Sequence, residues 1–227
     1  MMKKVSDSTY RMMRAFCSLL VLLLLGASIA VAADDYHPKP AVSGASAQAK
    51  WTQPATSDMD ALTSIFTRRS VRKYTSQPVS DDTIKILLQA AMSAPTARDE
   101  RSWEFIVIRD KEILRQVPSF HPFAKHIPDA PVAIVIVGNK KLEAQPGLWV
   151  ADCSNAAMTI LLAAHSMGLG AVWTTFYPYP DRMAGIRKLL SLPDNIEPLN
   201  IIPIGYPAEK KGPESRFNPA KIHYDRW

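Results

Sequence analysis

The middle of the chain alternates apolar and polar residues with the period of amphipathic helices. A first helix is predicted from Asp58, as its N-cap, to Thr67, and a second between Ser80, also a capping residue, and Pro95. The apolar face of the first helix consists of Leu62, Ile65 and Phe66. The apolar face of the second consists of Ile84, Leu87, Leu88 and Ala91.

Four short apolar, β-branched runs bounded by turn-forming residues predict strands. They are Trp103 to Ile108, Pro131 to Val137, Leu169 to Phe176 and Leu199 to Tyr206. Further short helices are predicted from Lys111 and over Asp181 to Leu190. Strands and helices mix without strict alternation, and no longer repeat is visible. The expected fold class is therefore α/β in the broad sense, or α+β.

The longest predicted helix, Leu148 to Met167, is apolar on nearly all sides. A helix without a polar face lies either in the core or at a subunit interface, and both remain open for this chain. Gly168 is expected to end the helix in the left-handed conformation that glycine adopts easily.

Residues 1–33 are expected to be an export signal. A positively charged start precedes an apolar stretch from Leu19 to Leu25, and Ala30-Val31-Ala32 has the small residues that a signal peptidase requires. The uncharged run from Ala15 to Ala33 would also suit an uncleaved membrane anchor. In both cases the positive charge places the remaining chain outside the cytosol, and the bacterial periplasm is the expected location.

Residues 34–57 are rich in Ala, Ser, Pro and Gln and are expected to form a flexible linker before one folded domain, residues 58–227. The apolar fraction of 47% is sufficient for a substantial core. Without the signal, Cys153 would be the only cysteine, so no internal disulfide is expected. The net charge of +6 is inflated by the signal and is too mild for a nucleic-acid-binding protein.

No hydrolytic or metal-binding motif is recognisable. His121 and His126 do not have the spacing of helical metal ligands, and His165 lies inside the apolar helix, where a core or interface role is expected. Cys153 on the same helix is expected to be inert. Gly168-Leu169-Gly170 follows a helix and enters a strand, which is the reverse of a dinucleotide-binding turn.

The strongest candidate for chemistry is the segment Arg68-Arg69-Ser70-Val71-Arg72-Lys73-Tyr74, which we call the basic segment. Arginine offers forked donors that fit phosphate oxygens, and arginines this close together repel one another unless an anion lies among them. Taken alone, such a run is more typical of a solvated surface. Three other features suit the same anionic, planar ligand: the polar loop Thr96 to Ser102, the small residues of Gly168 to Ala171, and Arg216.

The order of these features resembles the nitroreductase-like family of FMN-dependent oxidoreductases. The basic segment is similar to the family's first FMN segment, and A-P-T-A-R-D-E-R-S-W at 94–103 is similar to its A-P-S/T-A-x-N-x-Q-P-W loop. G-L-G-A-V-W-T-T at 168–175 is similar to the segment that passes the isoalloxazine ring. G-Y-P at 205–207, followed by Arg216, is similar to the closing motif with its phosphate-binding arginine.

The resemblance implies a nitroreductase-like fold, with a mostly antiparallel central sheet flanked by helices and FMN at a homodimer interface. It assigns the FMN phosphate, ribityl chain and pyrimidine edge to Arg68, Arg69, Ser70 and Arg72. Further FMN contacts are assigned to Pro95, Thr96, Ala97, Asp99, Gly170, Ala171, Trp173, Thr174 and Arg216. No metal is implied, and flavin N5 carries the chemistry in place of a catalytic side chain.

The chain departs from the family pattern in the second motif, where Asp99, Arg101 and Ser102 replace the usual Asn, Gln and Pro. An ionised Asp only accepts hydrogen bonds, whereas an Asn amide also donates them. The change could shift the potential of the flavin, weaken its binding or select another reduced state, with Arg101 compensating part of the charge.

By resemblance, the expected function is that of an exported FMN-dependent oxidoreductase with a two-step cycle. NAD(P)H reduces the flavin, and a small electrophile such as a nitroaromatic or a quinone then takes the electrons. Reduced nicotinamides are cytosolic, so export predicts another physiological donor or NAD(P)H activity only in the test tube. A flavin-binding or flavin-handling protein without turnover and a non-catalytic envelope protein remain alternatives. Membrane contact is expected only through an uncleaved signal.

Overall fold

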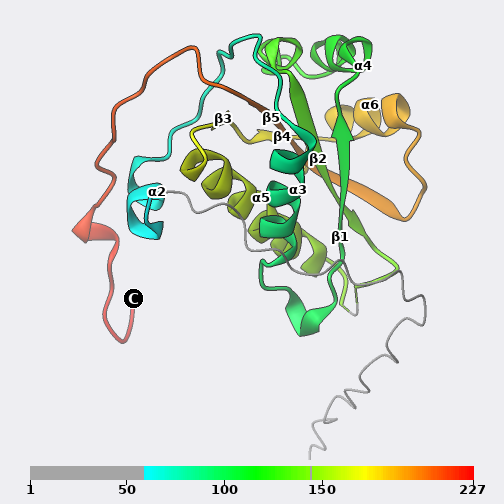
Figure 1. Ribbon diagram of the computed structural model, residues 1–227. Helices are drawn as coiled ribbons and strands as arrows, with labels where there is room; N and C mark the ends of the chain where they lie inside the picture. The colour runs from blue at the N-terminus through cyan, green and yellow to red at the C-terminus, as the bar shows by residue number, and fades with distance from the viewer. Residues whose placement is uncertain (1–58, 144) are drawn as a thin grey trace, which may run out of the picture. The chain divides into compact units, whose positions relative to one another are not determined.

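The computed structural model describes residues 59–143 and 145–227 (Figure 1). The predicted export signal and linker lie outside the described residues. The α-helices are α2 (Ala61–Thr67), α3 (Asp81–Met92), α4 (Lys111–Gln116), α5 (Leu148–Ser166) and α6 (Pro180–Leu190). Single 3-10 turns are η1 (Ala97–Asp99), η2 (Val117–Ser119), η3 (Ile127–Asp129) and η4 (Pro219–Lys221).

The strands of the described chain form one sheet in which every pairing is antiparallel. Its order is β1 (Trp103–Ile108), β2 (Val132–Asn139), β5 (Ile196–Gly205) and β3 (Gly170–Ala171). A further short strand, β4 (Thr174–Thr175), also pairs with β5. The predicted class, a mostly antiparallel sheet flanked by helices, is confirmed.

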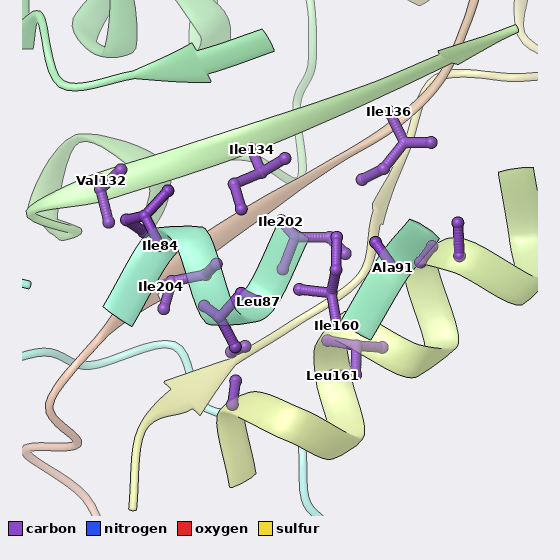
Figure 2. Close-up of a cluster of buried hydrophobic side chains, with 14 of the residues drawn as sticks. Ile84, Leu87, Ala91, Val132, Ile134, Ile136, Ile160, Leu161, Ile202 and Ile204 are labelled. Atoms are coloured by element: carbon purple, nitrogen blue, oxygen red, sulfur yellow. The ribbon is translucent and has the colours of Figure 1, made fainter. Parts of the chain in front are cut away.

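Alternate residues of β2 enter two different cores, because successive side chains of a strand point to opposite faces. Val132, Ile134 and Ile136 pack with residues of β5, α3 and α5 (Figure 2). Ala133, Val135 and Val137 belong to a second core that includes residues of α4 and α6. The domain therefore has three layers, and both faces of the sheet are covered by helices.

The start of helix α3 is determined by a local sequence signal. The Ser80 side chain accepts a hydrogen bond from Thr83 N at 3.1 Å, so it caps the helix as predicted. Asp81 and Asp82 lie in the first turn, where a negative charge is favourable. The predicted apolar face turns inward, with Ile84, Leu87 and Ala91 buried. The packing of α3 against α5 places the loop after α3 beside α5.

Helix α5 packs beside α3 on one face of the sheet and also contacts α2 (Figure 1), so it has neighbours on several sides, which accounts for its nearly uniform apolar sequence. Gly168, just after its end, has a φ of +76° and confirms the predicted left-handed ending. Among the described residues, no helix combines the length and the apolar content that crossing a bilayer would need.

The predicted strand from Leu169 to Phe176 is wrong in its middle. Gly170 pairs with Gly205 and Thr174 pairs with Ile201, so β3 and β4 share one register on β5. In that register Pro203 lies opposite the interruption, and proline has no N–H to donate to a neighbouring strand. The chain therefore leaves the sheet at Val172 and Trp173 and returns at Thr174.

The predicted start of the first helix is also wrong, because α2 begins at Ala61 with Asp60 as its N-cap. The Asp60 side chain accepts from Thr63 N at 3.0 Å. This short helix contacts α5 through polar groups, with Ser64 Oγ donating to Leu162 O at 3.1 Å. Its apolar face points outward: Leu62, Ile65 and Phe66 are 63%, 48% and 69% exposed.

Candidate functional site

The basic segment leaves α2 and runs beside β3 and the C-terminal arm, which we define as residues 206–227. Val71 N donates to Ala171 O at 3.0 Å, and Thr75 N donates to Tyr206 O at 2.9 Å. Isolated bridges join Ser70 to Ala171 and Tyr74 to Pro207. Three motifs that are far apart in the sequence, around 68–74, 168–175 and 205–216, are therefore neighbours in space.

Gly170 is required at the contact between two of these motifs. A Cβ atom at Gly170 would lie 2.5 Å from Cγ1 of Val71, closer than two carbon atoms can approach. From the sequence, the small residues Gly168 to Ala171 are expected to let a flat ring approach the backbone. At Gly170 the Val71 side chain fills the place of a Cβ, and the absent side chain lets the basic segment lie directly against β3.

Charges of one sign gather around Arg68. Burial lowers the pKa of its guanidinium, and the neighbouring Arg216 and Arg69 lower this pKa further. Arg68 Nε is buried and has no hydrogen-bond partner among the described residues. A buried N–H on a charged group without an acceptor is unfavourable, so this position fits an anion.

Arg69 and Arg216 meet at one carboxylate of the C-terminal arm. The Glu214 carboxylate lies 3.1 Å from Arg69 Nη2 and 3.1 Å from Arg216 Nη2. Hydrogen bonding and attraction from Arg216, together with the charge of Arg69, lower the pKa of Glu214. The structure thus brings the predicted residue Arg216 to the basic segment, and Glu214 balances part of the positive charge.

Two further residues of the arm hold the basic segment and were missed by sequence analysis. Arg72 N donates to Glu209 Oε1 at 2.7 Å, and Lys211 Nζ donates to Ser70 O at 2.7 Å. Lys211 Nζ also pairs with Glu209 Oε1 at 3.0 Å. The alternation of acidic and basic residues just after G-Y-P was the available signal, but only the fold shows which groups they meet.

The second motif forms a loop, residues 95–102, which we call the proline loop. Arg98, Asp99 and Arg101 all have positive φ, between 50° and 56°. Such conformations cost on the order of 1 kcal/mol or more for each non-glycine residue. Arg101 donates to the Asp99 carboxylate twice, from Nε to Oδ1 at 2.8 Å and from Nη2 to Oδ2 at 2.9 Å. Arg101 therefore compensates the charge of Asp99, as expected.

Helix α5 fixes the proline loop through two residues that sequence analysis did not assign. Asp152 Oδ1 accepts from Ala97 N at 2.8 Å, and Asp152 Oδ2 accepts from Ser102 Oγ at 3.1 Å. Asn155 Nδ2 donates to Pro95 O at 3.2 Å. A signal existed, because Asp152 is the one charged residue of an otherwise apolar helix and a buried charge needs partners.

The proline loop does not lie beside the other three motifs within one chain. It is bonded to the first turns of α5, whereas β3 follows the last turn. At about 1.5 Å per residue, Asp152 and Ser166 are about 21 Å apart along the helix. Figure 1 shows the turn between α3 and β1 at one end of α5 and β3 at the other. Pro95, Thr96, Ala97 and Asp99 therefore form a separate group from the basic segment.

Trp173 and Thr174 point to opposite sides of the sheet. Trp173 is partly buried against the core that contains α3 and α5. Thr174 is 5% exposed, and its hydroxyl lies 3.2 Å from His126 Nε2. Burial, followed by repulsion from Arg72, lowers the pKa of His126 to about 4. The hydroxyl of Thr174 is thus engaged by a neutral imidazole.

The other residues weighed for acid–base or nucleophilic chemistry are structural. His121 Nε2 lies 2.9 Å from Thr175 O, and His165 Nε2 lies 2.8 Å from Thr67 Oγ1, where it links α5 to the end of α2. Burial lowers the pKa of both imidazoles. Burial also raises the pKa of the Cys153 thiol, which keeps it protonated and confirms the predicted inert role.

Known proteins share this fold. The nitroreductase family model matches residues 65–120 and 121–206. A protein of Methanothermobacter thermautotrophicus, provisionally named NADH dehydrogenase/NAD(P)H nitroreductase, is 51% identical over 171 residues, which are 75% of this chain and 90% of the relative. A crystal structure of a protein with the same provisional name from Bacteroides thetaiotaomicron has 47% identity and a TM-score of 0.71, over 74% of this chain and 98% of that one.

One structure with this fold contains the cofactor FMN. A crystal structure from Desulfovibrio desulfuricans, described provisionally as a nitroreductase in complex with FMN, has 26% identity and a TM-score of 0.65. It covers 74% of this chain and 98% of the other. The chain therefore belongs to the nitroreductase family and has its fold.

Proposed function

We propose that this protein is an FMN-dependent oxidoreductase that accepts electrons from NAD(P)H and passes them to a small electrophile such as a nitroaromatic or a quinone. The observation that carries the proposal is the buried, unpartnered Nε of Arg68 among further cations beside β3. Relatives named as NAD(P)H nitroreductases and the FMN complex of a family neighbour support it.

Arg68, Arg69 and Arg216, which we call the arginine cluster, fit the phosphate of FMN. Arg68, Arg69 and Arg216 would hold the phosphate, because guanidinium groups bind its oxygens in pairs. Ser70 and Arg72 follow directly and would meet the ribityl chain and the pyrimidine edge. When bound, FMN supplies a two-electron carrier that exchanges hydride equivalents at N5.

In this chemistry the protein binds and orients the flavin and balances its charge. The histidines His121, His126 and His165 are hydrogen-bonded and have lowered pKa values, so they are neutral at pH 7. Neutral, engaged imidazoles are poorly suited to move protons at a ligand. Arg72, at the pyrimidine edge, would supply fixed positive charge that stabilises negative charge developing on the bound ring system.

Two copies of the chain would complete each site. Within one chain the proline loop and the basic segment lie at opposite ends of α5, whereas a second copy can bring its proline loop to the basic segment of the first. Apolar surface suited to such pairing is exposed on α2 and on the C-terminal arm, where Phe217, Tyr224 and Trp227 are 77%, 82% and 101% exposed. Burial of side chains of this size contributes about 1.5–3 kcal/mol each. The proposed assembly is a homodimer.

The proposed location is the bacterial periplasm, with an uncleaved anchor as the alternative. It rests on the charged start, the apolar stretch and the small residues of positions 1–33. Because NAD(P)H is cytosolic, the physiological donor at that location would be a different reductant, and NAD(P)H would serve as donor in vitro.

The direct test is redox cycling of the purified protein loaded with FMN. NADH or NADPH should bleach the visible flavin absorption, and a quinone added afterwards should restore it. Flavin that dithionite reduces but neither nicotinamide reduces would contradict NAD(P)H as donor and favour a flavin-handling protein. Protein that stays colourless after incubation with FMN would overturn the proposal and favour a non-catalytic role.

A further inference from the structure

A single carboxylate joins both ends of the proline loop to helix α5. Each oxygen of Asp152 accepts one hydrogen bond, from the backbone N–H of Ala97 on one side and from the hydroxyl of Ser102 on the other. Asp152 is 1% exposed and Ser102 is fully buried. The contact is therefore shielded from water, and both the carboxylate and its two donors would lack partners without it.

The loop between these two anchors has a conformation that it does not favour by itself. Three of its residues, Arg98, Asp99 and Arg101, have positive φ although none is glycine. Strained backbone of this kind persists only where the surroundings hold it. The bonds to Asp152 supply that hold from the core side, and the Asn155 side chain adds one bond at Pro95 O.

The outer side of the loop, by contrast, is available to a ligand. The side chains of Arg101 and Asp99 are 63% and 69% exposed and form an ion pair, whereas Asp152 is buried. A rigid inner side and an exposed outer side are the arrangement expected of a loop that must present groups in fixed positions.

We infer that Asp152 is a positioning residue that holds the proline loop in the shape required to contact the flavin bound by the second copy of the chain. This inference rests on the proposed function. Asp152 would not itself touch the flavin: it would act through Ala97 N and Ser102 Oγ, so its loss would release both ends of the loop at once.

Three variants separate this role from general stability. Asp152→Ala removes both acceptors. Asp152→Asn keeps an acceptor for Ala97 N and places an amide donor beside Ser102 Oγ, which can accept. Ile160→Val is the matched control, because Ile160 is buried on the same helix but belongs to the apolar core and has no bond to the loop.

Two measurements apply to each variant. The first is the rate of trypsin cleavage after Arg101, followed by mass spectrometry, which reports the loop with or without flavin. The second is the Kd for FMN from fluorescence quenching, together with the visible circular dichroism of bound flavin. The circular dichroism depends on the surroundings of the ring and does not follow stability.

For Asp152→Ala we expect loop cleavage to rise and FMN affinity to fall by roughly 10-fold or more, with altered circular dichroism, because two buried hydrogen bonds to a charged group are lost. Asp152→Asn should restore most of both, and Ile160→Val should change neither. Unchanged cleavage in Asp152→Ala would overturn the inference, as would faster cleavage with unchanged FMN binding.

The failure of the proposed function would look different. Wild-type protein that binds no FMN would refute the flavin site itself, and with it the role of Asp152 toward flavin, even if trypsin cleavage still showed that Asp152 holds the loop.

Discussion

At the scale of single residues, the arginine cluster is the feature that most clearly requires a bound anion. Arg68 is half-buried beside Arg69 and Arg216, and its Nε has no acceptor among the described residues. Glu214 pairs with Arg69 and Arg216 but not with Arg68. The arginine cluster therefore has a buried donor and excess positive charge that an anion would balance. A run of arginines on a solvated surface would have its donors hydrogen-bonded to water.

The first prediction concerns these charges. Arg68→Ala combined with Arg72→Ala should weaken FMN binding by roughly 10-fold or more, because charge-assisted hydrogen bonds to the phosphate and to the pyrimidine edge are lost. The matched control is Arg115→Ala, since Arg115 pairs with Glu112 on α4 and lies away from the cluster. Flavin titrations measure the effect. Equal affinities for the double variant and the control would show that the cluster is only a surface run.

The second prediction concerns His126, whose pKa falls from 6.5 to about 4 in the folded protein. Between these values the unfolded chain binds a proton that the folded chain does not, so the free energy of unfolding should decrease as the pH falls through this window. His126→Gln should show a weaker decrease. Urea unfolding midpoints at about pH 7 and about pH 4.5 measure it. His223→Gln on the exposed arm should keep the wild-type pH dependence, and an identical slope for His126→Gln would contradict the account.

At the scale of elements, the site depends on close contact between the basic segment and β3. Val71 occupies the space where a side chain at position 170 would lie, and Val71 N bonds Ala171 O. Tyr74 adds a second tie, because its hydroxyl donates to Val71 O at 2.7 Å and approaches Pro203 O at 3.3 Å. The gap between β3 and β4, opposite Pro203, thus lies next to the contact between the basic segment and β3.

The third prediction tests that contact. Gly170→Ala should destabilise the domain by about 1–3 kcal/mol, as overpacking does, and should lower FMN affinity by displacing the basic segment. Adding Val71→Ala should recover part of both losses, because it removes Cγ1, the nearest clashing atom at 2.5 Å, and leaves only the contact with Cβ at 2.8 Å. Gly212→Ala is the control, since no atom lies within 4 Å of an added Cβ there. Thermal unfolding and flavin titration suffice, and a Gly170→Ala protein equal to the control would contradict the packing argument.

Local signals predicted the elements well where the partner is close in sequence. Ser80 caps α3 through Thr83, and the continuous apolar run of β2 correctly indicated a strand. The break between β3 and β4 was not predictable from their own residues, because its cause is Pro203 on another strand. For the same reason, the bonds from Asp152 to the proline loop could be suspected as a buried charge but not assigned.

The candidate site was predictable in composition and not in arrangement. The motifs identified the basic segment, the residues near β3 and Arg216, and the structure brings these together. It does not bring Pro95, Thr96, Ala97 and Asp99 to them, because α5 separates the two groups within one chain. Sequence order carries no information about which copy of a chain completes a site.

At the scale of the whole molecule, α2 presents its apolar face outward although its spacing is that of a packed helix. It docks on α5 through the hydroxyls of Ser64 and Thr67, so the apolar side remains for another partner. The basic segment begins directly after this helix. A second copy that covers α2 would therefore also lie close to the arginine cluster, which connects assembly to the site.

The fourth prediction follows from that surface. Phe66→Glu should shift the protein from dimer to monomer and lower its flavin content, because a charge would be buried in the interface. Phe123→Glu is a control with similar exposure, 73% against 69%, in the segment between η2 and η3. Sedimentation velocity reports the change. Dimers of unchanged affinity in Phe66→Glu would remove α2 from the interface.

The measurement that tests the central claim most directly is complementation between two defective copies in one dimer. One copy carries Arg68→Ala with Arg72→Ala, the other carries Asp152→Ala, and the mixed dimer is isolated through different affinity tags. If each flavin lies between the basic segment of one copy and the proline loop of the other, one site of the mixed dimer is intact. The account predicts that the mixed dimer binds FMN with wild-type affinity at one site, while both parental dimers bind weakly. A mixed dimer as weak as its parents would contradict the account.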